Sequence, residues 1–329
     1  MKMNYNTHTL ANGLRIIHLP SAQPVVYCGY AVGAGTRDEE LGREEGMAHF
    51  CEHITFKGTE RRSSMQILGH LESVGGDLNA FTNKEETVYH AAVLKENIDR
   101  AVDLLTDIVF HSTYPQAEID KEVEVIVDEI ESYNDSPAEL VYDLFENAVF
   151  GGHPLGHNIL GTAEKLRRYT TADALRFTRR YYRPENSVFF AYGDVDFQKL
   201  VRLLERANAA DAAAESVAAV SLPPQQSAIS DNSCCGGGKD TAAALLPPYV
   251  AQHIEHHMDT HLAHVMLGTR AYDVHDERRI ALYLLNNILG GPGMTARLNV
   301  SLRERNALVY TVESMAQSYS DTGLWAVYF

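Results

Sequence analysis

The sequence predicts an α+β fold made of two layered units, in each of which helices cover a sheet. Three observations support this prediction: short β-rich segments bounded by turn residues, amphipathic segments with helical spacing, and a polar stretch that separates the two series. The chain has 329 residues, of which 45% are hydrophobic and 22% are charged, so it can bury a sizeable core. This length favours two domains over one.

The first unit is expected to begin with strands and to continue with helices. Residues 14–19 alternate after a turn, and residues 25–32 are rich in β-branched and aromatic side chains, so both are expected to be strands. From Gly46 the apolar spacing is helical, and Gly58 stops it. The other expected elements are a capped helix at 63–74, a hairpin of strands at 78–82 and 87–94, helices at 96–111, 116–133 and 136–149, two helices within 163–182, and a strand at 187–193.

A change in composition marks the end of the first unit. Residues 207–247 are rich in Ala, Ser, Gln, Gly and Pro and lack apolar periodicity, so we expect a linker. Beyond it we expect a strand at 261–268, helices at 276–289 and 295–304, and strands at 310–317 and 323–329. The expected domains are 1–206 and a partial second domain at 248–329, because about 80 residues fall short of the usual ~100 to 200.

Charge and cysteine content narrow the classes of partner and compartment. The 28 Lys and Arg against 44 Asp and Glu give a formal charge of −16, which would repel the phosphates of a nucleic acid. Cys28, Cys51, Cys234 and Cys235 form no disulfide framework, which favours reduced thiols. No segment is apolar enough to cross or enter a membrane. The default compartment is the cytoplasm, although a leader removed before this numbering would allow a periplasmic or exported form.

The segment HFCEH, residues 49–53, is the main candidate for chemistry. On a helix His49 and His53 share one face, and Glu52 stands beside them. Two imidazoles and a carboxylate suit zinc, which takes three protein ligands in a catalytic site. The order H-x-x-E-H is that of the inverted zincin motif. Two histidines at this spacing can instead form a surface pair or a half-buried pair satisfied by the backbone.

A later helix offers a further carboxylate for the same ion. Residues 121–137 place Glu122 and Glu129 two turns apart on one face, while apolar residues of this segment would bury the helix against the sheet. A carboxylate held beside apolar side chains needs a partner, and a metal ion is one such partner.

The chain resembles the M16 family of zinc metallopeptidases, the group of pitrilysin, insulin-degrading enzyme and mitochondrial processing peptidase. The resemblance covers nearly the whole chain except the linker. The segments that carry it are GTRDE (35–39), HFCEHITFKGT (49–59), GGDLNAFTNKEETVYH (75–90), VIVDEIESYNDSP (125–137), HPLGHNILGT (153–162), YYRPENSVFFAYGD (181–194) and LNNILGGPGMTARLNVSLRERNALVYTV (285–312). In this family a glutamate ligand follows the H-x-x-E-H helix on a later helix, and Glu129 lies 76 positions after His53.

The resemblance implies a zinc endopeptidase that cuts peptides or unfolded short polypeptides, with one zinc ion per chain. It assigns His49, His53 and Glu129 as the zinc ligands. It assigns Glu52 as the general base that takes a proton from the zinc-activated water. Glu122 matches a family glutamate that would orient a ligand or the water, and its alternative is an ordinary exposed helix residue.

The resemblance also implies a surface for the substrate. LNAFT, residues 78–82, should be an edge strand that takes a peptide as an added strand, with Asn79 and Ala80 in contact with it. Alternatively, Asn79 only ends a strand or turns the chain. Arg303 and Tyr310 match residues that the family brings over the zinc site from the opposite half. There Arg303 would hold a carbonyl and Tyr310 would donate a hydrogen bond to the oxyanion. Alternatively, either residue is structural, Arg303 as a solvated helix residue.

Family members enclose the substrate between two homologous halves, each a mostly antiparallel sheet covered by helices. The second half stops early in this chain, which suggests a fragment, so pairing with a second copy or with a partner subunit would complete the chamber. The alternative function is a non-catalytic peptide-binding or assembly subunit of the same fold. The intact set of predicted zinc residues argues against it. A hydrolase of non-peptide substrates would have no use for the LNAFT edge strand.

Two weaker patterns are not predicted to be ligand-binding sites. GGGKDT, residues 236–241, is similar to a phosphate loop but lacks its first glycine and its Ser or Thr. A second set of histidines has no carboxylate or cysteine pattern around it, so an exposed cluster is expected rather than a metal site. These are His253, His256, His257, His261 and His264.

Overall fold

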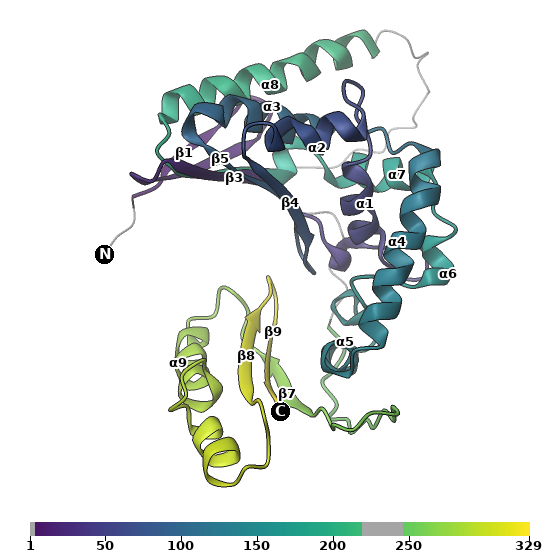
Figure 1. The fold of residues 1–329 in the computed structure, drawn as a ribbon, viewed down its shortest axis with the longest axis vertical. Helices are drawn as coiled ribbons and strands as arrows, with labels where there is room; N and C mark the ends of the chain where they lie inside the picture. Colours follow the sequence, from purple (N-terminus) through teal and green to yellow (C-terminus); the bar gives the residue numbers. More distant parts are fainter. Residues whose placement is uncertain (1–3, 219–245) are drawn as a thin grey trace, which may run out of the picture. The chain divides into compact units, whose positions relative to one another are not determined.

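The computed structural model describes residues 4–218 and 246–329 (Figure 1). The chain forms two compact units, residues 1–126 with 162–243 and residues 127–161 with 244–329. The division between them falls within one continuous helix, α4 (Gln116–Asn134). None of the described helices combines the length and the apolar character needed to span a bilayer.

A six-stranded sheet forms the base of the first unit, in the order β1-β2-β6-β3-β5-β4. All neighbouring strands are antiparallel except β2 and β6, which run parallel. The strands are β1 (Asn6–Thr9), β2 (Arg15–Pro20), β3 (Val25–Val32), β4 (Asp77–Thr82), β5 (Thr87–Leu94) and β6 (Ser187–Gly193). The prediction of a mostly antiparallel sheet with helices is thus confirmed, and β4 is an edge strand of this sheet.

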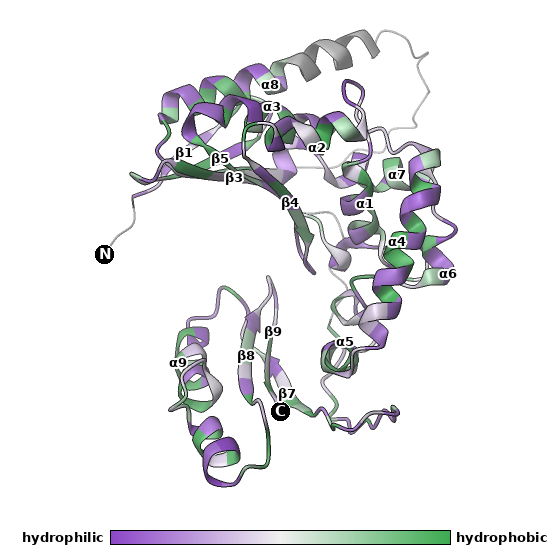
Figure 2. Ribbon diagram, in the orientation of Figure 1, coloured by the Kyte–Doolittle hydropathy of each residue, from purple (hydrophilic) through white to green (hydrophobic). Residues whose placement is uncertain are grey.

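Helices cover one face of this sheet and leave the other face more exposed. In β3, Cys28 and Tyr30 are fully buried, whereas the neighbouring Tyr27 is 49% exposed. On the buried face α3 packs against β3 and β5, and α8 packs against α3 (Figure 1). In Figure 2 the strands are largely hydrophobic, while these helices carry residues of both kinds, as expected of amphipathic helices. Besides α4, the α-helices described in the first unit are α1 (Met47–Thr55), α2 (Ser64–Glu72), α3 (Ile98–His111), α6 (Ala163–Leu166), α7 (Thr171–Tyr181) and α8 (Phe197–Ala218).

The second unit has a smaller sheet, in which three antiparallel strands follow the order β7-β9-β8. Asn286 joins α9 to this sheet, because its Nδ2 donates to the Ser314 carbonyl at 2.9 Å and its Oδ1 accepts from Trp325 Nε1 at 3.0 Å. A small core forms around Phe150 and Leu324. The elements are α5 (Pro137–Phe150), β7 (Met266–Ala271), α9 (Arg278–Gly290), the π-helix η5 (Asn299–Arg305), β8 (Glu313–Ser318) and β9 (Gly323–Tyr328).

Several expected element boundaries differ from those of the structure. The strand expected from residue 261 begins at Met266, where its regular pairing with β9 begins. One residue earlier, Val265 exchanges two backbone hydrogen bonds with Phe329. The strand expected from residue 310 begins at Glu313. Strand β1 was not predicted, since its sequence NTHT has no apolar alternation.

The stretch expected as a linker begins as helix. Helix α8 continues to Ala218, twelve residues into the predicted 207–247 segment, because the alanines there are strong helix formers. Residues 219–245, with Cys234, Cys235 and the GGGKDT segment, lie outside the described residues. The domain boundaries at 206 and 248 stay a prediction. The other two cysteines are buried free thiols, and burial raises the pKa of Cys28 to about 12.

Candidate metal centre

Helix α1 presents the HFCEH segment in one fixed orientation. It starts after Gly46, whose φ of 84° lies in the left-handed region that favours glycine. The buried Glu39 carboxylate accepts hydrogen bonds from the backbone N–H groups of Gly46 at 2.9 Å and Ala48 at 2.8 Å, which satisfies two donors of the helix N-terminus. Phe50 and Ile54 are fully buried. Anchored in this way, α1 places His49 and His53 together on a neighbouring face.

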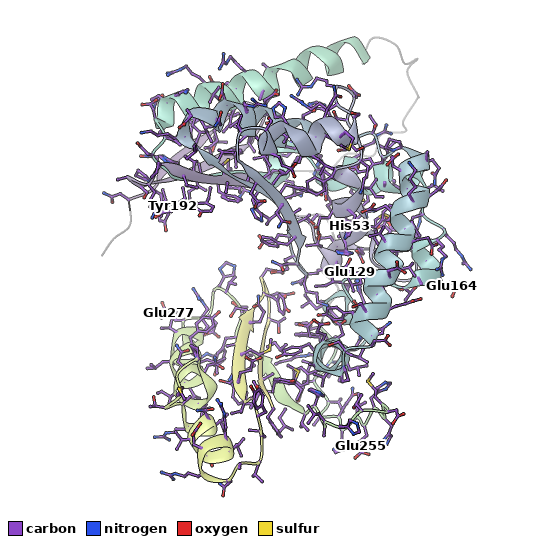
Figure 3. The ribbon with its side chains drawn as sticks, viewed as in Figure 1. His53, Glu129, Glu164, Tyr192, Glu255 and Glu277 are labelled. Carbon is purple, nitrogen blue, oxygen red and sulfur yellow. The ribbon has the colours of Figure 1, made fainter. Side chains whose placement is uncertain are left out.

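Three of the residues predicted as ligands lie together. His49, His53 and Glu129 each offer one ligand atom, and these atoms all lie within 4.8 Å of one another. His49 is buried, at 7% exposed, and its ring centroid lies 4.6 Å from that of His53. His53 comes from α1 and Glu129 from α4 (Figure 3). Two imidazole nitrogens and one carboxylate oxygen fit a catalytic zinc ion, and the described ranges hold no other group of this kind.

Glu122 contacts the second histidine. Its Oε1 lies 3.2 Å from His53 Nδ1 and its Oε2 lies 2.6 Å from Lys57 Nζ. Burial alone would raise the pKa of Glu122, but hydrogen bonds and charge from His53 and Lys57 outweigh burial and hold this pKa below its ordinary value. The Glu122 side chain is only 13% exposed, so the alternative of an ordinary exposed helix residue is wrong. A carboxylate on Nδ1 would leave Nε2 for a metal.

Glu52 is held by a residue of the edge strand. Thr82 Oγ1 donates to Glu52 Oε2 at 2.6 Å, and Thr82 is the last residue of β4. Neither this contact nor that of Lys57 follows from the sequence analysis. Period-two alternation places Thr82 on the face opposite to Phe81, but only the fold shows that α1 lies against that face.

The predicted substrate strand has an open edge within its sheet. In the described sheet β4 pairs with β5 alone. Asn79 lies in the middle of β4, so the alternative that it only ends a strand is wrong. Its Oδ1 accepts from the backbone N–H of Ala80 at 2.8 Å. Contact of Asn79 and Ala80 with a substrate stays a prediction.

The sequence of this chain matches two protein-family models and several named proteins. The model of the insulinase family, peptidase family M16, matches residues 16–163, and the model of the M16 inactive domain matches residues 168–329. An uncharacterized zinc protease of Bacillus subtilis, YmxG, is 33% identical over 98% of this chain and 72% of its own length. The chain belongs to the M16 peptidase family. An uncharacterized zinc protease of Streptomyces coelicolor is 36% identical over 97% of this M16 chain and 66% of its own length.

Solved structures share the fold of this M16 chain. A protease from Helicobacter pylori superimposes with a TM-score of 0.82 at 22% identity, over 99% of this chain and 74% of its own. An M16 inactive domain from Pseudomonas fluorescens superimposes with a TM-score of 0.78 at 20% identity, over 99% of this chain and 74% of its own. At these identities the likeness concerns the fold alone.

The other two predicted substrate residues of this M16 chain lie in the second unit. The Arg303 guanidinium is 5.8 Å from the centre of the Tyr310 ring, and Tyr310 is 87% exposed. Both line a cavity of about 310 Å³. Their contact with a substrate at the zinc site stays a prediction. Tyr310 lies just before β8 rather than within it.

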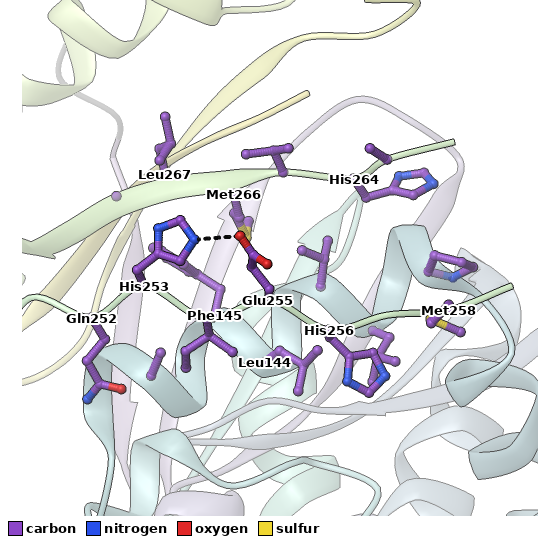
Figure 4. Close-up of a pocket in the computed structure, with 18 of the residues that line it drawn as sticks. Leu144, Phe145, Gln252, His253, Glu255, His256, Met258, His264, Met266 and Leu267 are labelled. Carbon is purple, nitrogen blue, oxygen red and sulfur yellow. Dashed lines mark hydrogen bonds and ion pairs between the residues drawn. The ribbon is translucent and has the colours of Figure 1, made fainter. Parts of the chain in front are cut away.

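The second set of histidines lines a different cavity. This space, about 720 Å³, lies between α5 and residues 249–268 (Figure 4). His253 lies 3.2 Å from Glu255, and the side chains of His253 and His257 are 84% and 92% exposed. The expectation of an exposed cluster therefore holds for His253 and His257, whereas His264 is partly buried and its Nδ1 lies 2.7 Å from the Tyr328 hydroxyl.

Lys57 should support the metal centre through Glu122. Replacing Lys57 by Met removes the cation that pairs with Glu122 Oε2 and leaves this carboxylate less firmly placed beside His53. We expect zinc affinity, measured by competition with a chromophoric chelator, to fall about tenfold, the lower end of what outer-shell changes cost. Lys121→Met is the control, because Lys121 is 71% exposed and pairs with Glu118. Equal zinc affinity in both variants would contradict the expectation.

Proposed function

We propose that this chain is a zinc-dependent endopeptidase that hydrolyses peptides or unfolded short polypeptides. The observation that carries the proposal is the convergence of ligand atoms from His49, His53 and Glu129 within 4.8 Å. Membership of the M16 peptidase family and the similarity to proteins named zinc proteases support it.

In this proposal each residue beside the zinc site has a separate role. Zinc, when bound, would polarise the scissile carbonyl and lower the pKa of a water. Glu52 takes the proton of the attacking water and passes it to the leaving amine. Glu122 orients His53 through its Nδ1, and Lys57 balances the charge of Glu122.

The substrate binds as an extended chain at the open edge of β4. Backbone groups of an added strand would pair with those of β4, so binding depends mainly on an unfolded backbone and less on side chains. This mode suits unfolded polypeptides, because most backbone N–H and C=O groups of a folded substrate are already paired within its own structure. A partner subunit or a second copy would complete an enclosing chamber.

Metal analysis combined with digestion of a peptide library tests the proposal. We expect one zinc ion per chain and cleavage of unfolded peptides. A chelator should stop this cleavage, and added zinc should restore it. A folded protein containing the same sequences serves as the control and should stay intact. Zinc-loaded protein that leaves every peptide of the library uncut would contradict the proposal and favour the peptide-binding alternative.

A further inference from the structure

We infer that Thr82 is a positioning residue for Glu52, so that the strand expected to receive the peptide also fixes the general base. The inference rests on the proposed function, in which Glu52 moves the proton. The relevant contact is the hydrogen bond from Thr82 Oγ1 to Glu52 Oε2 at 2.6 Å. This length is typical of a hydroxyl that donates to an ionised carboxylate, a bond stronger than one between neutral groups.

The Thr82 hydroxyl is itself firmly placed. Thr82 is 9% exposed and pairs across the hairpin with Thr87. The Thr87 hydroxyl lies 3.5 Å from that of Thr82 and donates to the Ala34 carbonyl at 3.0 Å. A β-branched side chain is also stiff at χ1. The donor therefore moves with the backbone of β4 and β5 and not as an independent rotor.

Glu52 has a long side chain whose orientation this contact restricts. An unrestrained Glu samples many rotamers, and holding it in one costs conformational entropy. A general base must lie within hydrogen-bond reach of the proton that it takes. A donor on Oε2 restricts the rotation of the Glu52 carboxylate and so helps to set the direction in which it faces the water. We therefore expect the contact to affect the chemical step more than substrate binding.

The position of Thr82 on β4 links this contact to substrate binding. Thr82 ends the strand whose middle holds Asn79 and Ala80. A peptide paired with the open edge of β4 would lie along the same strand that carries Thr82, so this strand would set the position of the peptide relative to Glu52. Substrate docking and alignment of the base would then depend on the same six-residue strand.

Two substitutions of Thr82 separate the hydroxyl from the shape of the side chain. Thr82→Val keeps the branched shape without the donor, and Thr82→Ser keeps the donor. In the full zinc-loaded chain we expect Thr82→Val to lower kcat about tenfold or more, with KM within about twofold, and Thr82→Ser to restore most of kcat. Zinc content should not change. Thr7→Val, on the exposed strand β1 at the far edge, is the matched control and should retain full activity.

A crystal structure of Thr82→Val gives a second readout that does not depend on turnover. We expect the Glu52 carboxylate to occupy more than one orientation there, and a single one in Thr82→Ser. A Thr82→Val protein with wild-type kcat, or with Glu52 in its original single orientation, would overturn the inference. If the inference is overturned in this way but Glu52→Gln loses turnover, the proposed function still stands. Turnover that survives in Glu52→Gln would instead reject the proposed function and this inference together.

Discussion

Glu52→Gln should abolish most peptide hydrolysis while leaving zinc binding intact. The amide keeps the size of the carboxylate but cannot take a proton from water near neutral pH. General acid–base catalysis contributes about 10²- to 10⁴-fold to a rate, so we expect kcat to fall by a factor in this range. Glu52 is not among the three residues whose ligand atoms converge. Zinc stoichiometry and zinc affinity should therefore match those of the wild type.

The measurement compares kcat on a cleavable peptide with zinc content of the same preparation. Glu72→Gln is the control, because Glu72 is exposed at the end of α2 and the charge change is the same. The control should retain wild-type kcat. Cleavage at the wild-type rate in Glu52→Gln with zinc bound would show that another group acts as base. Loss of zinc together with activity would instead place Glu52 among the ligands.

The local part of the site could be predicted from the sequence. Two histidines four residues apart on a helix share a face whatever the rest of the chain does, and the structure indeed brings His49 and His53 together. The position of the helix was predictable as well, because its apolar spacing and its flanking glycines are local signals. The residues offered Glu122 and Glu129 of a later helix as partners for the same ion, and the family resemblance selected Glu129 as the ligand.

The contacts around the site could not be predicted in this way. Lys57 and Thr82 meet Glu122 and Glu52 across 65 and 30 positions of sequence, and no local pattern encodes which element packs against which. The same reason accounts for the start of β7 at Met266 instead of residue 261, since a strand extends only as far as its partner. The polar strand β1 shows the converse: backbone pairing with β2 makes a strand where side-chain alternation gives no signal.

Glu129→Gln should weaken zinc binding more than any other single change in α4. A catalytic zinc site uses three protein ligands, and without the charged oxygen of Glu129 only the imidazoles of His49 and His53 remain. The neutral amide also removes the charge that offsets part of the charge of the ion. Changes to outer-shell partners already cost about 10- to 100-fold in affinity, so loss of a ligand should cost more than about 100-fold.

Because Glu129 is exposed, a loss of zinc in Glu129→Gln can be separated from a loss of stability. Glu129 is exposed, so its replacement should leave the unfolding temperature of the zinc-free protein unchanged. Glu131→Gln on the same helix, also exposed, carries the same loss of charge and should keep wild-type zinc affinity. If both variants lost zinc equally, the general negative charge of α4 would be responsible and not coordination. If neither lost zinc, Glu129 would not be a ligand, and the convergence on which the proposed peptidase activity rests would have no chemical role.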